Sequence, residues 1–244
     1  CIRDSYYFSS LVIPGSPSRK LYVGNGCDPA VFSPTRAFAS QLSFNTLSDA
    51  LSGTRVIGYV GRMSEEKGVL DLIEAFSALA TSIPDLSLLL VGGNLNSDRP
   101  SSVVATIEQL QSCFPGRIHY TDIVADTSRY LSLMDLFVLP SYREGLPTSL
   151  IEAMMTNLVC VATDIRGSRE LIQHSITGFL YPPHDVQALI SLLSRILDIY
   201  DRSAGFSSVL AASPRDAMLS RGCTINAVIH EYMQFYSTFS SPFC

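Results

Sequence analysis

Short apolar segments alternate with helix-like patterns from Arg55 to Tyr200, and this alternation constrains the fold more than any other feature of the chain. The apolar segments, rich in Val, Ile and Leu, read RVIGYVG, LSLLLVGG, RIHYT, DLFVLPS, LVCVATD and GFLYP. The helix-like segments between and after them include GVLDLIEAFSALATS, SSVVATIEQLQSC, TSRYLSLM, TSLIEAMMT, GSRELIQH and DVQALISLLSRILDIY. Strands that take turns with helices form βαβ units, in which a mostly parallel sheet is covered on both faces. We therefore predict an α/β fold with a doubly wound, Rossmann-like parallel sheet.

The alternation stops on both sides of this region. Before Arg55, the segment SSLVIPGSPSRKLYVGNGCDPAVFSPTR (residues 9–36) is rich in Pro, Gly and Ser, contains one strand candidate at residues 20–24 (KLYVG), and reads as a linker. Residues 201–244 contain two or three helical segments without intervening strands, including PRDAMLSRG and TINAVIHEYMQFY. These helices could pack on the edge of the sheet or reach toward another domain.

Composition excludes several classes of protein. An apolar content of 47% with 16% charged residues indicates a large core and excludes a disordered chain. The net charge of −5 gives no support to a nucleic-acid surface. No apolar run approaches the roughly 20 residues that cross a bilayer, and the first residues lack the pattern of a signal peptide. The six cysteines include no C-x-x-C pair, which favours free thiols in a reducing compartment over disulfides or a zinc site.

Ligands of open α/β sheets bind at the carboxyl ends of the strands, so the residues after each strand are the informative ones. The first strand is followed by GRMSEEKG, in which Gly61 allows a close turn and Arg62 and Lys67 place two cations near a helix start, a setting suited to phosphate. The alternative is two solvated surface cations. The segment is not a P-loop, because G-x-x-x-x-G-K-[ST] is absent. No G-x-G-x-x-G fingerprint follows a strand either, and its absence disfavours an NAD-dependent oxidoreductase.

The segment REGLPTSLIE follows the strand DLFVLPS and holds two carboxylates, Glu144 and Glu152. The helix expected after Pro147 should leave backbone N–H groups open to an anion. A carboxylate can accept hydrogen bonds from two hydroxyls, as in ribose or a sugar ring. Spacing alone proves little, because Glu66 and Glu74 repeat it on what we expect to be a solvated helix face.

Two further segments are candidates. In DIVAD, Ile123 and Val124 could line a pocket for a base, or the segment could be an ordinary turn with Asp126 as a helix N-cap. In IRGSREL, a flexible Gly167 precedes Glu170, which we expect in the first turn of a helix. There it would either bind a ligand or only favour the helix dipole.

Taken together, GYVGRMSEEKGVLDLIEAF, DLFVLPSYREGLPTSLIEAM and VATDIRGSRELI…TGFLYPPHD resemble the C-terminal half of a GT-B glycosyltransferase of the retaining family 4, of the kind that builds bacterial polysaccharides. The resemblance extends from about Leu21 to Ile196. It implies three parts: residues 1–54 as the tail of a missing N-terminal domain with the interdomain linker, 55–200 as the nucleotide-sugar-binding domain, and 201–244 as C-terminal helices.

The resemblance also implies roles for individual residues. Arg62 and Lys67 would hold the donor diphosphate, Glu144 would lie near the transferred sugar, and Glu152 would bind the ribose. The implied catalytic residues are Arg62, Lys67 and Glu144, and the implied donor-binding residues are Gly61, Ile123, Val124, Gly145, Leu146, Pro147, Thr148, Glu152 and Glu170. The family's N-G-V-D loop corresponds to Asn25-Gly26-Cys27-Asp28, and we expect its cysteine to be harmless.

The function implied is a retaining hexosyl- or N-acetylhexosaminyltransferase, incomplete without its N-terminal GT-B domain. Its co-substrate would be a nucleoside diphosphate sugar, with uridine favoured, and its acceptor a saccharide or a lipid-linked saccharide. We expect no cofactor, no metal and no nucleic acid, and a cytoplasmic location, with attachment to the inner membrane face left open. A non-catalytic nucleotide-sugar-binding module is the alternative. We expect structural roles for the four histidines, His119, His174, His184 and His230.

Overall fold

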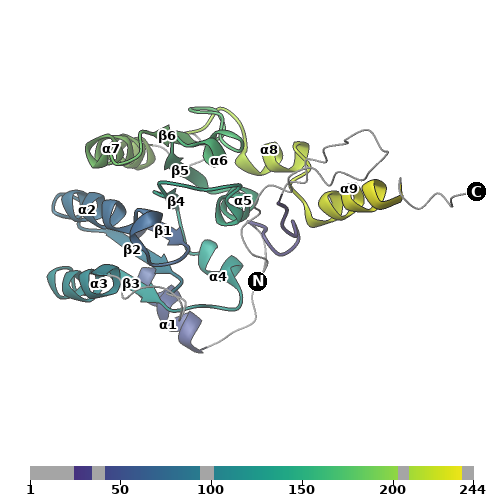
Figure 1. The fold of residues 1–244 in the computed structure, drawn as a ribbon. Helices are drawn as coiled ribbons and strands as arrows, with labels where there is room; N and C mark the ends of the chain where they lie inside the picture. Colours follow the sequence, from purple (N-terminus) through teal and green to yellow (C-terminus); the bar gives the residue numbers. More distant parts are fainter. Residues whose placement is uncertain (1–24, 35–41, 94–101, 203–208, 238–244) are drawn as a thin grey trace, which may run out of the picture.

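Six strands form one sheet at the centre of the computed structural model, which describes residues 25–34, 42–93, 102–202 and 209–237. The strands are β1 (Arg55–Val60), β2 (Leu86–Val91), β3 (Ile118–Thr121), β4 (Leu136–Leu139), β5 (Val159–Thr163) and β6 (Phe179–Tyr181). They lie in the order β3-β2-β1-β4-β5-β6, and every neighbouring pair is parallel (Figure 1). The predicted doubly wound, Rossmann-like α/β class is confirmed.

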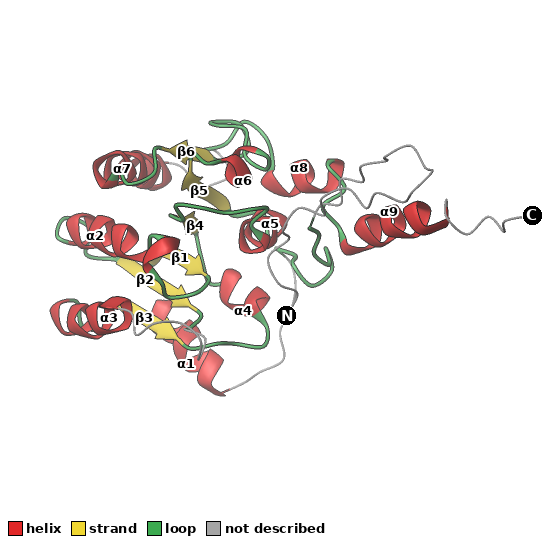
Figure 2. Ribbon diagram, in the orientation of Figure 1, coloured by secondary structure: helices red, strands yellow, loops and turns green. Residues whose placement is uncertain are grey.

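Helices cover both faces of this sheet (Figure 2). The helical elements of the described residues are α1 (Leu42–Leu51), the 3₁₀ turn η1 (Glu65–Lys67), α2 (Val69–Ala80), α3 (Ser102–Cys113), α4 (Thr127–Leu131), α5 (Thr148–Met155), α6 (Arg166–Arg169), α7 (Val186–Arg202), α8 (Pro214–Ser220) and α9 (Ile225–Ser237). Helices α7, α2 and α3 form a row on one side of the sheet in Figure 1, while α4 and α5 lie on the other. Helix α2 packs against α7 and α3, and α5 packs against α8.

The core lies where these two helix layers meet the sheet. All residues of β2, β4 and β5 are buried, which explains why their sequences are nearly continuous apolar runs. Helix α2 contributes the buried side chains Leu72, Phe76 and Leu79, spaced so that they lie on one helical face. Phe76 and Phe137 are fully buried. The layered core therefore leaves the loops at the strand ends as the places where polar side chains gather.

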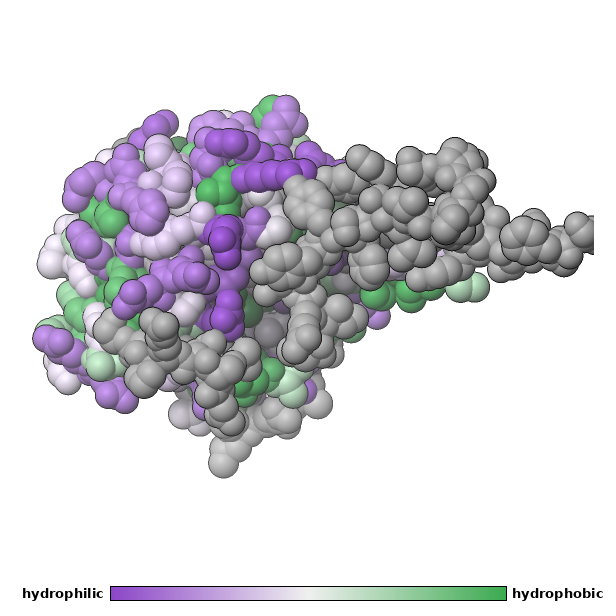
Figure 3. Space-filling view, viewed as in Figure 1, coloured by the Kyte–Doolittle hydropathy of each residue, from purple (hydrophilic) through white to green (hydrophobic). Residues whose placement is uncertain are grey.

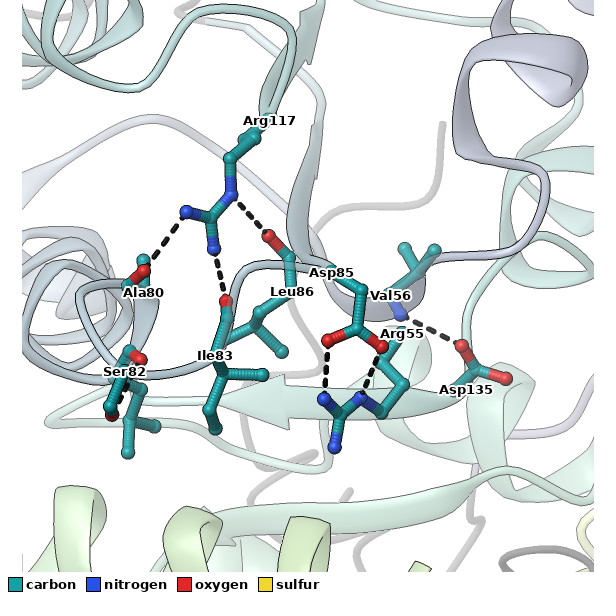
Figure 4. Close-up of polar contacts among 10 residues, drawn as sticks. Arg55, Val56, Ala80, Ser82, Ile83, Asp85, Leu86, Arg117 and Asp135 are labelled. Atoms are coloured by element: carbon teal, nitrogen blue, oxygen red, sulfur yellow. Dashed lines mark hydrogen bonds and ion pairs between the residues drawn. The ribbon is translucent and has the colours of Figure 1, made fainter. Parts of the chain in front are cut away.

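Polar contacts fix the amino-terminal edge of the sheet (Figure 4). The guanidinium of Arg117 donates to the carbonyls of Ala80, Ile83 and Leu86 at 2.9, 2.6 and 2.9 Å, closing the end of α2 and the turn after it. The Asp135 carboxylate, just before β4, accepts a hydrogen bond of 2.7 Å from the Val56 backbone N–H on β1. This edge is therefore held by its own side chains, opposite the edge where ligands of such sheets bind.

Helix α1 lies in a region that the sequence predicts to be a linker. The edge of the Phe44 ring contacts the ring of Tyr130, with centroids 6.1 Å apart, and Leu51 is buried. Tertiary packing of this kind stabilises helices whose own propensity is weak, which is why the sequence pattern missed this one. The strand candidate at residues 20–24 lies outside the described residues.

The helix predicted over GSRELIQH is much shorter in the structure. Helix α6 starts at Arg166 and ends at Arg169, and Glu170 is its C-cap. The prediction that Glu170 lies in a first helical turn is therefore wrong. The apolar side chains of Leu171 and Ile172, directly after this short helix, are buried. By contrast, α8 and α9 appear where two C-terminal helices were predicted.

Helix α9 extends away from the sheet and carries exposed apolar side chains (Figures 1 and 3). Ile225, Ile229, Tyr232 and Met233 repeat at helical spacing and are 39%, 51%, 38% and 66% exposed. Part of this apolar strip is visible in Figure 3 below the atoms drawn in grey. Among the described residues, no helix combines the length and apolar character that crossing a membrane requires.

Gly68, between η1 and α2, lies where the loop after β1 packs against the loop after β4, at the carboxyl edge of the sheet. Its φ is +63°, and a Cβ there would lie 2.1 Å from the Pro140 carbonyl oxygen. Gly53 has a similar φ of +76° but open space around it. We expect Gly53→Ala to cost about 1–2 kcal/mol from backbone strain alone, and Gly68→Ala to cost clearly more. Urea unfolding of both variants checks this, and equal losses would contradict it.

Candidate functional site

The strand order places the candidate site between β1 and β4. Strand β1 is flanked by β2, which follows it in sequence, and by β4, where the direction of winding reverses. Ligands of open α/β sheets bind in the crevice at such a reversal, outside the carboxyl ends of the strands. The loops after β1 and β4 are the two that the sequence singled out.

The loop after β1 is shaped by glycines and by Tyr59. The Tyr59 hydroxyl donates to the Arg62 carbonyl at 2.8 Å, and a Cβ on Gly61 would lie 2.4 Å from that hydroxyl oxygen. The loop then enters η1, which ends at Lys67. Gly61 is required because Tyr59 folds back beneath the loop, which carries both Arg62 and Lys67.

Lys67 and Glu144 form an ion pair across the two loops. The Lys67 Nζ lies 2.7 Å from the Glu144 Oε1, and the two side chains are only 16% and 9% exposed. Charged hydrogen bonds shielded from water in this way are stronger than those on an open surface. The sequence predicts Lys67 and Glu144 separately as site residues, and the structure shows that their side chains are paired.

Glu144 is followed by a tight turn into α5. Pro147 is the N-cap of α5 and no side chain of the described residues caps its first turn, as expected from the sequence. Asn25 donates from its Nδ2 to the Leu146 carbonyl at 2.8 Å and lies 3.4 Å from the Thr148 Oγ1. On the other side, a Cβ on Gly167 would lie 2.1 Å from the Gly145 carbonyl oxygen. Gly167 is thus a site of close backbone packing rather than of flexibility.

Glu152 lies one turn inside α5, in a partly buried position. The Thr127 hydroxyl on α4 donates to its Oε2 at 3.1 Å. Burial raises the pKa of the Glu152 carboxyl from its ordinary value of 4.5 to about 7, and the neighbouring Asp126 contributes to this rise. Near neutral pH this group therefore exists both as a carboxylate, which only accepts hydrogen bonds, and as an acid, which also donates one.

The loops after β3 and β5 hold the remaining predicted residues. Ile123 is 65% exposed, whereas Val124 packs partly against the core. Asp126 caps α4, accepting from the Ser128 N–H at 3.1 Å, as one of the two readings of this segment predicted. Glu170 is exposed at the end of α6, where Arg166 Nε lies 3.2 Å from its Oε1. The structure does not bring Glu170 into contact with Lys67, Glu144 or Glu152 through any described hydrogen bond.

Each histidine contacts a neutral group. His119 lies 3.1 Å from the Gly116 carbonyl, His174 Nδ1 accepts from the Leu180 N–H at 3.0 Å, and His230 lies 2.8 Å from Gln234 Nε2. His184 stacks on the ring of Tyr142. These contacts agree with the structural roles predicted for them. The cysteines that the structure describes are free thiols, also as predicted: Cys27, Cys113, Cys160 and Cys223.

Tyr142 is the residue of this region that the sequence reading passed over. It follows β4 directly, two positions before Glu144, and its hydroxyl donates to the Asp71 Oδ1 of α2 at 2.8 Å. The only indication in the sequence that Tyr142 belongs to the site is its position in the segment SYREG, which contains Glu144. An aromatic ring after an apolar strand reads as part of the core unless its hydroxyl partner is known.

The fold and the position of these loops agree with a known family. Residues 54–198, more than half of the 244-residue chain, match the family model described as "Glycosyl transferases group 1". The chain belongs to the group 1 glycosyltransferases. The resemblance found in the sequence motifs is thereby confirmed, while the retaining stereochemistry and family 4 membership stay predictions.

Curated relatives of this group 1 glycosyltransferase are bacterial glycosyltransferases. It is 31% identical to the amylovoran biosynthesis glycosyltransferase AmsK of Erwinia amylovora over 71% of this chain and 44% of that protein. It is 27% identical to the UDP-Gal:alpha-D-GlcNAc-diphosphoundecaprenol alpha-1,3-galactosyltransferase of Escherichia coli, over 81% of this chain and 48% of that protein. The chain spans about half the length of the curated relatives it matches.

Solved structures give the same fold. The Anabaena protein HepE, crystallised with UDP and glucose, superposes on this group 1 glycosyltransferase with a TM-score of 0.70. The two sequences are 24% identical, and the match covers 90% of this chain and 56% of HepE. The similarity shows that the chain has the Rossmann-like architecture of the GT-B enzymes.

The raised pKa of Glu152 predicts a pH-dependent stability in this group 1 glycosyltransferase. The folded chain holds the Glu152 proton more tightly than the unfolded chain, so the stability tied to this group is greatest below pH 4.5 and falls as pH rises toward 7. Glu152→Gln removes the titration. Relative to the wild type, its free energy of unfolding should increase between pH 4.5 and 8 by on the order of 3 kcal/mol.

Urea unfolding at several pH values measures this difference. Glu74→Gln, on an exposed face of α2, corrects for the general effect of removing one carboxylate. A difference between Glu152→Gln and the wild type that does not change with pH would show that Glu152 titrates as a solvent-exposed carboxyl does.

Proposed function

We propose that this chain is the nucleotide-sugar-binding half of a retaining, metal-independent glycosyltransferase of the family 4 type. One observation carries the proposal: Lys67 and Glu144 pair at 2.7 Å beside the open N-terminus of α5, at the point where the sheet reverses its winding. A nucleoside diphosphate sugar has the complementary arrangement, with anionic oxygens directly next to sugar hydroxyls.

The cationic side of this pair suits the diphosphate. The Lys67 ammonium has three N–H donors, so it can keep its bond to Glu144 and still donate to phosphate oxygens. Arg62 lies on the same loop as Lys67, and α5 begins four residues after Glu144, so its first backbone N–H groups would add donors for an anion. Together they would stabilise the negative charge that develops on the leaving diphosphate.

The carboxylate side suits the transferred sugar. Glu144 has acceptor capacity beyond its bond to Lys67 and would accept hydrogen bonds from sugar hydroxyls. The backbone of Gly145, Leu146, Pro147 and Thr148 would lie against the sugar and the phosphates. We keep Glu170 as a further donor-binding residue on the neighbouring loop, since its exposed carboxylate is open to a ligand that extends over α6.

The nucleoside would occupy the side of the crevice toward α4. Glu152 would bind the ribose hydroxyls beside Thr127, and the exposed Ile123 would cover the base together with Val124. The name of the Escherichia coli relative specifies UDP-Gal, and HepE was crystallised with UDP and glucose. These two proteins support a UDP-sugar as the donor of this chain, without fixing whether the sugar is a hexose or an N-acetylhexosamine.

The acceptor would be a saccharide or a lipid-linked saccharide, presented by an N-terminal GT-B domain. The name of the Escherichia coli relative contains a diphosphoundecaprenol-linked sugar, and both named relatives are about twice as long as the matched region. The exposed apolar strip on α9 is the kind of surface that another domain would cover. In a retaining transfer the leaving phosphate and the incoming hydroxyl meet on one face of the sugar, so no base on this domain is needed.

The double variant Arg62→Ala/Lys67→Ala tests the phosphate role. Each charged hydrogen bond contributes about 1.5–3 kcal/mol, so affinity for UDP should fall by well over tenfold while affinity for uridine changes little. Isothermal titration calorimetry with both ligands measures this. Because removal of Lys67 leaves Glu144 unpaired, Lys67→Ala/Glu144→Gln serves as a second variant without that buried charge.

Arg55→Ala/Arg195→Ala is the matched control. It removes two positive charges away from the crevice, one at the amino edge of the sheet and one on the exposed face of α7. Equal losses of UDP and uridine affinity in Arg62→Ala/Lys67→Ala, or an equal loss of UDP affinity in the control, would argue against a phosphate clamp.

We expect the chain by itself to bind a UDP-sugar but to transfer the sugar poorly. Orienting two reactants supplies roughly 7–11 kcal/mol of a barrier, and one half of a cleft cannot orient an acceptor. Product formation from UDP-sugars and lipid-linked or oligosaccharide acceptors should rise by orders of magnitude when the N-terminal half of a close relative is fused to it. Efficient transfer without that half would contradict this prediction. Binding without transfer even in the fusion would favour a non-catalytic nucleotide-sugar-binding module.

A further inference from the structure

Tyr142 connects three loops at the carboxyl edge of the sheet. Its backbone N–H donates to the Glu66 carbonyl at 3.0 Å, and its hydroxyl donates to the Asp71 Oδ1 at 2.8 Å. Its ring stacks on His184, with centroids 3.8 Å apart and planes inclined by 29°. Tyr142 belongs to the β4–α5 loop, Glu66 and Asp71 to the end of the β1–α2 loop and the first turn of α2, and His184 to the β6–α7 loop.

These contacts lie next to the Lys67–Glu144 pair on both of its loops. Glu66 immediately precedes Lys67, and Tyr142 stands two residues before Glu144. Gly68 also fits against the Pro140 carbonyl, where a Cβ would lie at 2.1 Å. The β1–α2 and β4–α5 loops are therefore held in one register by Tyr142, and the position of the ammonium relative to the carboxylate depends on that register.

The hydrogen bond between Tyr142 and Asp71 is partly buried. The other carboxylate oxygen of Asp71, Oδ2, is buried and has no hydrogen-bond partner among the described residues, where Tyr142 supplies the only side-chain hydrogen bond to this carboxylate. Burial and the adjacent Asp71 raise the pKa of the Tyr142 hydroxyl to about 12. The hydroxyl therefore stays protonated and remains a donor at every pH at which the protein is handled.

We propose that Tyr142 is a positioning residue for the diphosphate site, which holds Lys67 and Glu144 in register by hydrogen bonding to Asp71 and Glu66. This inference rests on the proposed function, because it assigns Tyr142 to the phosphate part of the same crevice. Tyr142 does not touch the donor. It acts through Lys67, so its loss should affect ligands that carry a diphosphate and spare those that lack one.

Tyr142→Phe removes the hydroxyl and keeps the ring that stacks on His184. We expect UDP affinity to fall about three- to tenfold, the range for the loss of one net hydrogen bond, and uridine affinity to change less than about twofold. Tyr181→Phe is the matched control, since Tyr181 is buried nearby at the end of β6 and its hydroxyl has no hydrogen-bond partner in the structure. It should leave both affinities at the wild-type level.

A double-mutant cycle separates positioning from a general loss of stability. In the Lys67→Ala background, Tyr142→Phe should have almost no further effect on UDP affinity, because the group it positions is gone. The proposal would be overturned if Tyr142→Phe lowered UDP affinity by the same factor with and without Lys67. It would also be overturned if Tyr142→Phe lowered UDP and uridine affinity equally. If Tyr142→Phe does not fold, Asp71→Ala breaks the same hydrogen bond from the other side and must give the same pattern.

Failure of this inference can be told apart from failure of the proposed function. A wild-type chain that binds neither UDP nor uridine overturns both. A wild-type chain that binds UDP through Lys67, together with a Tyr142→Phe variant of unchanged affinity, overturns only the role of Tyr142.

Discussion

The parallel pairing of β1 with β4 brings together the two loops that carry Lys67 and Glu144. Ile57 pairs with Leu136 and Gly58 with Phe137, and the Asp135 carboxylate ties β4 to Val56 at the amino end. The Met134 side chain packs directly on Gly58 of this central strand, where a Cβ would lie 2.0 Å from the Met134 sulfur. With the amino ends fixed in this way, the loops after both strands leave the sheet side by side.

The sequence predicts the sheet well because its signal is local. Runs such as LSLLLV and LFVL are buried on both faces, and burial of this kind needs only a run of mostly apolar residues. It predicts α1 and α6 poorly, because the cause there is tertiary. Phe44 of α1 contacts Tyr130 far along the chain, and α6 ends at Arg169, just before the buried Leu171 and Ile172.

The candidate site likewise has features that the sequence predicts and features that it does not. The sequence shows which residues follow a strand, and this was enough to select the segments that carry Lys67, Glu144 and Glu152. Pairing and burial are not visible there. The bond between Lys67 and Glu144, the high pKa of Glu152 and the Tyr142–Asp71 contact all depend on which side chains share a space once the loops meet. The exposed position of Glu170 depends likewise on where α6 ends.

The residues that contact one another at the candidate site are far apart in the sequence. Lys67 and Glu144 are 77 residues apart, Asp71 and Tyr142 are 71 apart, and Asn25 reaches Leu146 over 121 residues. Closing such loops carries an entropic cost that local helices do not have, and topologies rich in distant contacts fold slowly. A chain emerging from the ribosome exposes Lys67 long before Glu144 exists. The loops that carry these residues can therefore meet only once β4 has paired with β1.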